Sequence, residues 1–302
     1  MNLRLLSKGK SALAIAAIAL LHTGCIEFDR QTVSYRIDTT RDSLLIFQNY
    51  HGIYGAEHED HLSGQEIDQF RSVLEKERTF FFANWIFELN LESITKTAAD
   101  LDEETADTPN ERALLKRAKA GFDAVRDNLT IGNGALYLDP EGRLCGTQTV
   151  RIRNLKSVLK AVNDAIAAFL ERKLLSSDID PEERLILEKA LRGKPVFISV
   201  DGNQIRFRHP LPEKVYRDEL IKPNGDEQIL SKLARSGIHV AHSDGELRVS
   251  IGQVTDEVTH ITMDTFSTPY RANALRFTQD EPIPVEPNYD PVAAATKFLG
   301  AK

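Results

Sequence analysis

The stretch Thr32–Phe47, TVSYRIDTTRDSLLIF, contains two strand patterns separated by a turn, and the rest of the fold is predicted around it. Val33, Tyr35 and Ile37 alternate with polar residues, which predicts a strand with one apolar face. Residues 38–42 (DTTRD) have the composition of a turn, and the apolar residues 44–47 follow as a second strand. The stretch therefore predicts an antiparallel hairpin near the start of the folded chain.

Further hairpins and helices alternate along the rest of the chain. Hairpins are predicted at residues 135–152, 196–208 and 238–251, around the turns DPEG, DGN and SDG. Capping patterns predict helices that start at Ser63, Thr108 and Asp180, and apolar spacing predicts a long helix over residues 155–175. Because no regular strand–helix–strand alternation is present, we expect an α+β fold of antiparallel hairpins interspersed with amphipathic helices, in one or two compact lobes.

Composition shifts suggest how the chain is divided. Residues 176–178 (SSD) separate a first α+β lobe (32–178) from a second (179–278). Residues 279–302 contain four prolines and predict an extended tail that ends in a short helix over 292–299. Residues 1–24 are predicted to be a signal peptide, and residues 25–31 a short tether.

The N-terminus has the layout of a secretory signal. Arg4, Lys8 and Lys10 precede the apolar run SALAIAAIALL (11–21), which is too short to span a membrane comfortably. The ending His22-Thr23-Gly24-Cys25 resembles the lipobox of bacterial lipoproteins. This resemblance implies an acylated Cys25 and, because Ile26 follows in place of aspartate, an outer-membrane location. A cleaved soluble chain and an uncleaved signal-anchor are the alternatives.

Charge and cysteine content narrow the function classes. The formal net charge is −7, and removal of the basic signal makes the chain more acidic, which argues against nucleic-acid binding. The chain has two cysteines, so acylation of Cys25 leaves Cys145 without a disulfide partner.

The stretch HGIYGAEHEDH (51–61) contains the strongest candidate metal ligands. His51, His58 and His61 lie within a short, acidic segment, and neutral imidazoles bind zinc, nickel or copper. The alternative is a solvated loop whose histidines bind nothing. The sequence contains no Gly-x-Ser-x-Gly, His-Glu-x-x-His, phosphate-loop or dinucleotide motif.

Four other features have a structural and a functional interpretation. Cys145 is a small buried residue or a nucleophile, and the aromatic run FFFANWIFEL (80–89) is a buried strand or a ligand groove. Arg151 with Arg153, and Arg206 with Arg208, are solvated strand faces or anion receptors. In each case the structural interpretation is the simpler one.

The sequence therefore predicts a membrane-anchored envelope lipoprotein with a non-catalytic binding or assembly role. Its expected partners are the membrane, through Cys25, and an envelope protein on which the proline-rich tail docks. One alternative is an exported metal-assisted hydrolase that uses His51, His58 and His61. The other is a carrier of a small apolar ligand bound between the aromatic run and the long helix.

Overall fold

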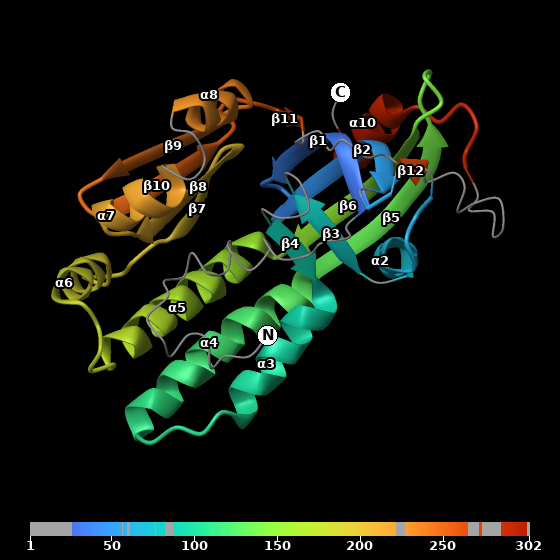
Figure 1. The fold of residues 1–302 in the computed structure, drawn as a ribbon. Helices are drawn as coiled ribbons and strands as arrows, with labels where there is room; N and C mark the ends of the chain where they lie inside the picture. The colour runs from blue at the N-terminus through green and yellow to red at the C-terminus, as the bar shows by residue number, and fades with distance from the viewer. Residues whose placement is uncertain are drawn as a thin grey trace.

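The fold is built on one large antiparallel sheet, here called the main sheet (Figure 1). The computed structural model describes residues 26–55, 57–58, 61–75, 77–81, 87–221, 227–264, 272–273 and 285–300. In spatial order the strands of the main sheet are β11 (Thr259–Asp264), β1 (Ile26–Asp38), β2 (Ser43–Gly55), β6 (Leu144–Arg153) and β5 (Leu129–Leu138), and β12 (Ala272–Asn273) pairs with β2.

Two smaller sheets and several helices complete the fold. The second sheet has the order β7 (Ile198–Asp201), β8 (Gln204–Pro210), β10 (Glu246–Ile251) and β9 (Ile238–Ser243), and β3 (Arg78–Phe81) pairs with β4 (Phe87–Asn90). The helices are α2 (Gly64–Glu75), α3 (Leu91–Glu103), α4 (Pro109–Asn128), α5 (Leu155–Leu174), α6 (Pro181–Ala190), α7 (Glu213–Val215), the π-helix η3 (Tyr216–Ile221), α8 (Glu227–Arg235) and α10 (Pro291–Leu299). The predicted α+β fold is confirmed. Within the described part of the chain, no helix combines the length and the apolar character needed to cross a membrane.

The β1–β2 hairpin forms where the sequence predicts it. The carboxylate of Asp38 accepts hydrogen bonds from the backbone N–H groups of Thr40 and Arg41, both at 3.0 Å, and so fixes the turn. Pairing continues to Ile26 opposite Gly55, well beyond the predicted strands. Residues 26–31, which we expected to form a tether, therefore belong to β1, because their backbone groups pair with β2.

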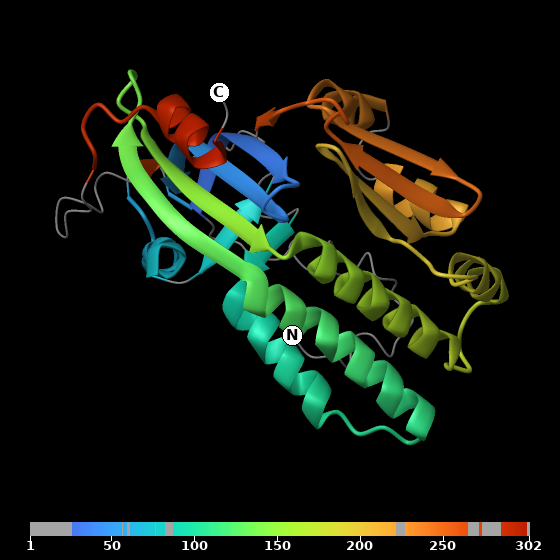
Figure 2. The same ribbon diagram turned by 180° about the vertical axis from the view of Figure 1, so that it is seen from behind.

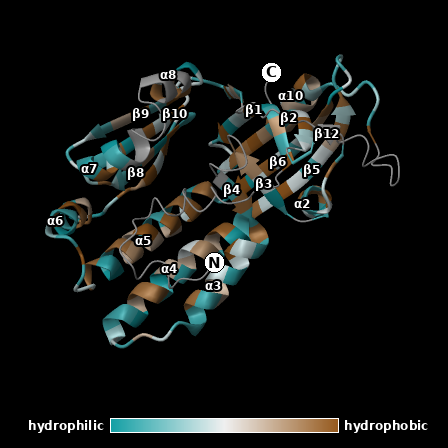
Figure 3. Ribbon diagram, viewed as in Figure 1, coloured by the Kyte–Doolittle hydropathy of each residue, from teal (hydrophilic) through white to brown (hydrophobic). Residues whose placement is uncertain are grey.

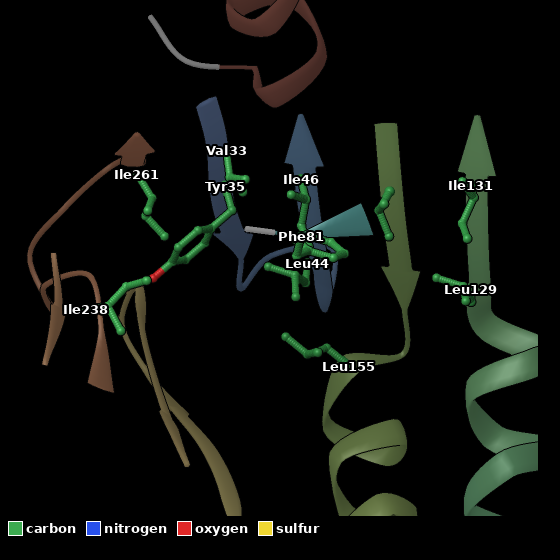
Figure 4. Close-up of a cluster of buried hydrophobic side chains, with 11 residues drawn as sticks. Val33, Tyr35, Leu44, Ile46, Phe81, Leu129, Ile131, Leu155, Ile238 and Ile261 are labelled. Atoms are coloured by element: carbon green, nitrogen blue, oxygen red, sulfur yellow. The ribbon is translucent and has the colours of Figure 1, made fainter. Parts of the chain in front are cut away.

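The largest apolar cluster joins the main sheet to the second sheet (Figure 4). Val33, Tyr35, Ile46 and Val150 contribute to it from the main sheet, and Ile238 from β9. The hydroxyl of Tyr35 donates to the backbone oxygens of Asn203 and Ile251 at 2.9 and 2.7 Å. The alternation of residues 33–37 thus positions both a core face and the contact between the two sheets.

A buried polar layer lies next to this cluster, between the main sheet and β3. It consists of five uncharged side chains, Gln31, Gln48, Tyr50, Thr79 and Gln148. Gln48 accepts from Gln31 Nε2 at 2.6 Å and donates to Thr79 Oγ1 at 2.6 Å, while the Tyr50 hydroxyl donates to Gln148 Oε1 at 2.9 Å. The layer holds the β3–β4 hairpin on the sheet without burying a charge.

Helices α3, α4 and α5 extend beyond one end of the main sheet, with hydrophobic and hydrophilic residues interleaved along them (Figure 3). The predicted cap at Thr108 and the predicted long helix are both present as α4 and α5. Helix α3 was not predicted from the sequence. Its N-cap is Asn90, whose side chain accepts from Ser93 N at 3.2 Å.

The C-terminal helix lies against the main sheet, on the face opposite to β3 and α2 (Figures 1 and 2). The predicted helix over 292–299 is confirmed as α10, and residues 279–284 of the tail lie outside the described residues. Leu299 is buried against Leu45 and Phe47, and Arg36 Nη1 donates to the Leu299 oxygen at 3.0 Å. The described end of the tail therefore docks on this chain itself.

Strand β11 brings the chain back from the second sheet to the main sheet. It pairs with β1 from Arg30 opposite Asp264 to Tyr35 opposite Thr259. Residues 259–264, expected in the second lobe, thus form an edge strand of the main sheet.

Candidate functional site

An open cavity of about 330 Å³ lies where β1 begins and β2 ends. Its lining residues are Asp29, Arg30, His51, Arg143 and Asp264, which we call the charged pocket. These residues come from four different strands or turns of the main sheet. The pocket thus joins parts of the chain that are far apart in the sequence.

The register of the sheet explains how the pocket is assembled. Arg30 lies directly opposite His51 in β2 and opposite Asp264 in β11. Gly52 has φ +65°, and a Cβ atom there would lie 2.5 Å from Asp29 Oδ2. Glycine at this position is therefore what lets the Asp29 carboxylate lie so close to the β2 backbone.

Ion pairs orient the two arginines. Arg30 Nε donates to Asp264 Oδ1 at 2.7 Å, and both side chains are more than half exposed. Arg143 Nε donates to Asp139 Oδ2 at 2.7 Å, and its Nη1 lies 3.5 Å from Asp29 Oδ2. Because both guanidinium groups are half exposed or more, the pairs position these groups more than they stabilise the fold.

His51 is the half-buried member of the charged pocket. Burial lowers its pKa below the ordinary value of 6.5, and the charges of Arg30 and Arg143 lower it further. Its Nε2 lies 3.3 Å from Thr32 Oγ1. The ring is therefore neutral at pH 7, and the lining charges are two guanidinium groups and two carboxylates.

A second ionisable group, Glu27, lies in β1 beside the pocket and opposite Tyr54. Burial raises the pKa of its carboxyl group from 4.5 to about 7. Among the described residues, no hydrogen-bond donor or cation is within bonding distance of this carboxyl group. Glu27 thus carries a desolvation cost when it ionises.

The three predicted metal ligands occupy different surroundings. His51 lines the charged pocket, whereas the rings of His58 and His61 are exposed and stack on each other with centroids 4.3 Å apart. Residues 59 and 60 lie outside the described residues. In the parts of the chain that are described, no group of three histidine, cysteine, aspartate or glutamate side chains is placed to hold a metal ion.

Of the two cysteines, only Cys145 lies among the described residues. Cys25, the predicted lipidation site, and the signal segment 1–24 lie outside the described residues. Cys145 in β6 is fully buried, and burial raises the pKa of its thiol. Its surroundings are those of a core residue, and a buried thiol is a poor nucleophile.

The other candidate residues that the structure describes lie in the core, over an aromatic ring or in ion pairs within the chain. Phe80 and Phe81 are buried in the core, while residues 82–86 lie outside the described residues. The Arg151 guanidinium lies over the Phe298 ring, 5.6 Å from its centroid. Arg206 and Arg208 form ion pairs with Asp201 and Glu246, respectively.

Sequence reasoning identified His51 but missed the four charged residues around it. The pairing of Arg30 with His51 follows from the β1–β2 turn once both strands are extended, so a signal was present. Asp264 and Arg143 depend on the strand order, which the sequence does not reveal. No protein-family model, curated protein or solved structure matches the chain.

Proposed function

We propose that this protein is a lipoprotein of the bacterial cell envelope, anchored through Cys25 and facing the periplasm from the outer membrane, with a non-catalytic binding role. The observation that carries the proposal is that β1 reaches Ile26, the first described residue, which directly follows the cysteine of the lipobox-like ending. A strand rises about 3.3 Å per residue. A lipid on Cys25 would therefore hold the first strand, and Asp29 within it, close to the membrane surface.

The charged pocket supports binding as the activity. Its guanidinium and carboxylate groups recognise charged ligand groups through charge-assisted hydrogen bonds. All five lining side chains are polar, so the pocket does not favour an apolar ligand. Arg30 pairs with His51 and Asp264 in the half of β1 that begins at Ile26, the residue that follows Cys25 in the sequence.

Mass spectrometry of the N-terminal peptide from the membrane fraction tests the anchor. We expect the wild-type chain to begin at Cys25 and to carry acyl chains. The Cys25→Ala variant should lack lipid and keep residues 1–24, because the modified side chain is missing. The matched control is Cys145→Ala, which removes the other cysteine and should leave lipidation unchanged. A wild-type chain that starts elsewhere without lipid would contradict the proposal.

A further inference from the structure

One end of the main sheet gathers charged residues, while the other adjoins the helices. The start of β1, the end of β2, the β5–β6 turn and the end of β11 meet at the charged end. Helices α4 and α5 adjoin the opposite end, at the start of β5 and the end of β6 (Figure 1). The charged pocket therefore lies at the end of the sheet where the described chain begins, at Ile26.

The pocket offers hydrogen-bond donors and acceptors on the same wall. Among the described residues, Arg30 uses only its Nε, for Asp264, so its two Nη groups remain available to a ligand. Arg143 is half exposed; its Nε donates to Asp139 and its Nη2 to Glu141 at 3.3 Å, and its Nη1 faces Asp29 at 3.5 Å. Asp264 is 71% exposed and accepts one hydrogen bond from Arg30. A ligand could therefore both accept from guanidinium groups and donate to carboxylates.

The charge balance selects the chemical class of ligand. A simple anion would meet the carboxylates of Asp29 and Asp264, and a simple cation would meet the guanidinium groups of Arg30 and Arg143. A zwitterion with one phosphate and one ammonium group satisfies both. His51 is neutral because its pKa is lowered, so it adds a hydrogen-bonding ring without changing this balance.

The lining residues also discriminate between ammonium groups. A quaternary ammonium has no N–H to donate and is recognised by aromatic side chains. The pocket is lined by carboxylates and contains no phenylalanine, tyrosine or tryptophan among the described lining residues. The pocket therefore fits a primary ammonium group, which donates hydrogen bonds to carboxylates.

We propose that the charged pocket binds the phosphoethanolamine headgroup of a membrane phospholipid. Its phosphate would lie between Arg30 and Arg143, and its ammonium group would lie against Asp29 and Asp264. The choice of a membrane phospholipid as the source of the headgroup rests on the proposed anchoring through Cys25. The fit of the headgroup to the pocket does not depend on that anchoring. The headgroup contact would fix the charged end of the sheet against the membrane.

Calorimetric titration of the full mature chain, purified from membranes in detergent, tests the pocket. The probes are the soluble compounds glycerophosphoethanolamine, glycerophosphocholine and glycerol phosphate. We expect glycerophosphoethanolamine to bind about tenfold more tightly than the other two, because only it accepts from the guanidinium groups and also donates N–H hydrogen bonds to the carboxylates. Equal binding of glycerophosphocholine, or no binding of glycerophosphoethanolamine, would overturn the proposal.

Asp264→Asn sharpens this test because it predicts a change of preference. Loss of the Asp264 carboxylate removes an acceptor for the ammonium group and frees Arg30 Nε, so glycerophosphoethanolamine should lose its advantage over glycerol phosphate. Asp164→Asn is the matched control, since Asp164 forms a similar exposed ion pair with Lys160 on α5. It should leave the preference unchanged. An Asp264→Asn variant that keeps the wild-type order of probes would overturn the proposed ammonium contact.

Native mass spectrometry of the detergent-extracted chain identifies the source of the headgroup. We expect phosphatidylethanolamine to stay bound to the wild type and to be lost from Arg143→Ala. Binding of glycerophosphoethanolamine without any retained phospholipid would overturn the membrane source and indicate a free solute. Absence of lipid on Cys25 would contradict the anchoring alone, because the soluble probes report the pocket independently.

Discussion

Two polar clusters lie in neighbouring rows of the same pair of strands. In one row Gln31 faces Tyr50, and in the next Arg30 faces His51. Gln31 is 1% exposed and belongs to the buried polar layer, whereas the Arg30 side chain is 55% exposed and belongs to the charged pocket. The first cluster is uncharged and enclosed by β3, and the second is charged and open to water.

The difference shows how one sheet separates stability from binding. Neutral side chains can be buried completely when partners satisfy their hydrogen bonds, as in the layer around Gln48. Arg30 and Asp264 instead pair at the surface, where both side chains keep more than half of their exposure to water. We therefore expect changes in the buried layer to affect folding and changes in the pocket to affect ligand binding.

The largest effect is expected for Gln48→Ala. The change removes the partner of Gln31 and Thr79 and leaves a cavity, so it should lower the free energy of unfolding by about 3 kcal/mol. Denaturant unfolding measures this value. Gln65→Ala on the exposed surface of α2 is the control and should change it by less than about 0.5 kcal/mol. Similar values for the two variants would show that the buried layer is not a source of stability.

Glu27→Gln should stabilise the protein at alkaline pH. The folded-state pKa of about 7 lies above the ordinary 4.5, so wild-type stability is lost as pH rises through this range. The uncharged glutamine avoids that loss. After allowance for partial exposure, we expect a gain of about 1–2 kcal/mol at pH 8 and none at pH 4.

Unfolding experiments at the two pH values test this expectation. Glu257→Gln, which removes an exposed carboxylate elsewhere, is the control for the change in net charge. A Glu27→Gln gain that is the same at pH 4 and pH 8 would count against ionisation as its cause.

The contribution of His51 to stability changes with pH in the opposite direction to that of Glu27. Its pKa is lowered in the folded protein, so the unfolded chain binds more protons, and stability falls as pH falls through 6.5. His51→Gln should remove part of this loss. His209, whose pKa is also lowered by burial, should contribute separately, so the double variant should be the least sensitive to acid. An unchanged slope of stability against pH in His51→Gln would refute the assignment.

The smallest effect on folding is expected for Arg30→Gln. It breaks an exposed ion pair with Asp264 and should change the free energy of unfolding by less than about 0.5 kcal/mol. Headgroup binding by the same variant should fall about tenfold. Thermal or denaturant unfolding measures the first value. A loss of stability comparable with that of Gln48→Ala would erase the distinction between the two clusters.

Much of the fold was accessible from local sequence patterns. The turn at residues 38–42, the caps at Ser63 and Thr108 and the hairpins of the second sheet are each set by neighbouring residues. Helix α3 was missed because it follows an apolar run and ends in acidic residues typical of a loop. Its buried Ala98 and Leu101 would have indicated a helix together with Ile94, since the three recur at helical spacing.

The charged pocket was less accessible for a physical reason. Its members meet through strand order, and β11 pairs with β1 across more than two hundred residues of sequence. Local patterns carry no information about which distant strand becomes a neighbour. Only the Arg30–His51 pairing was within reach, because a single hairpin turn determines it.

The return of β11 to the main sheet also has a consequence for the timing of folding. Until residue 264 has been added to the chain, the outer edge of β1 lacks its partner, and shorter chains leave its backbone groups exposed. Helix α10 arrives later still, against Leu45 and Phe47. Contacts of such long sequence separation are slow to form. Completion of the main sheet should therefore be a late step in folding, and chains that lack β11 should aggregate through β1.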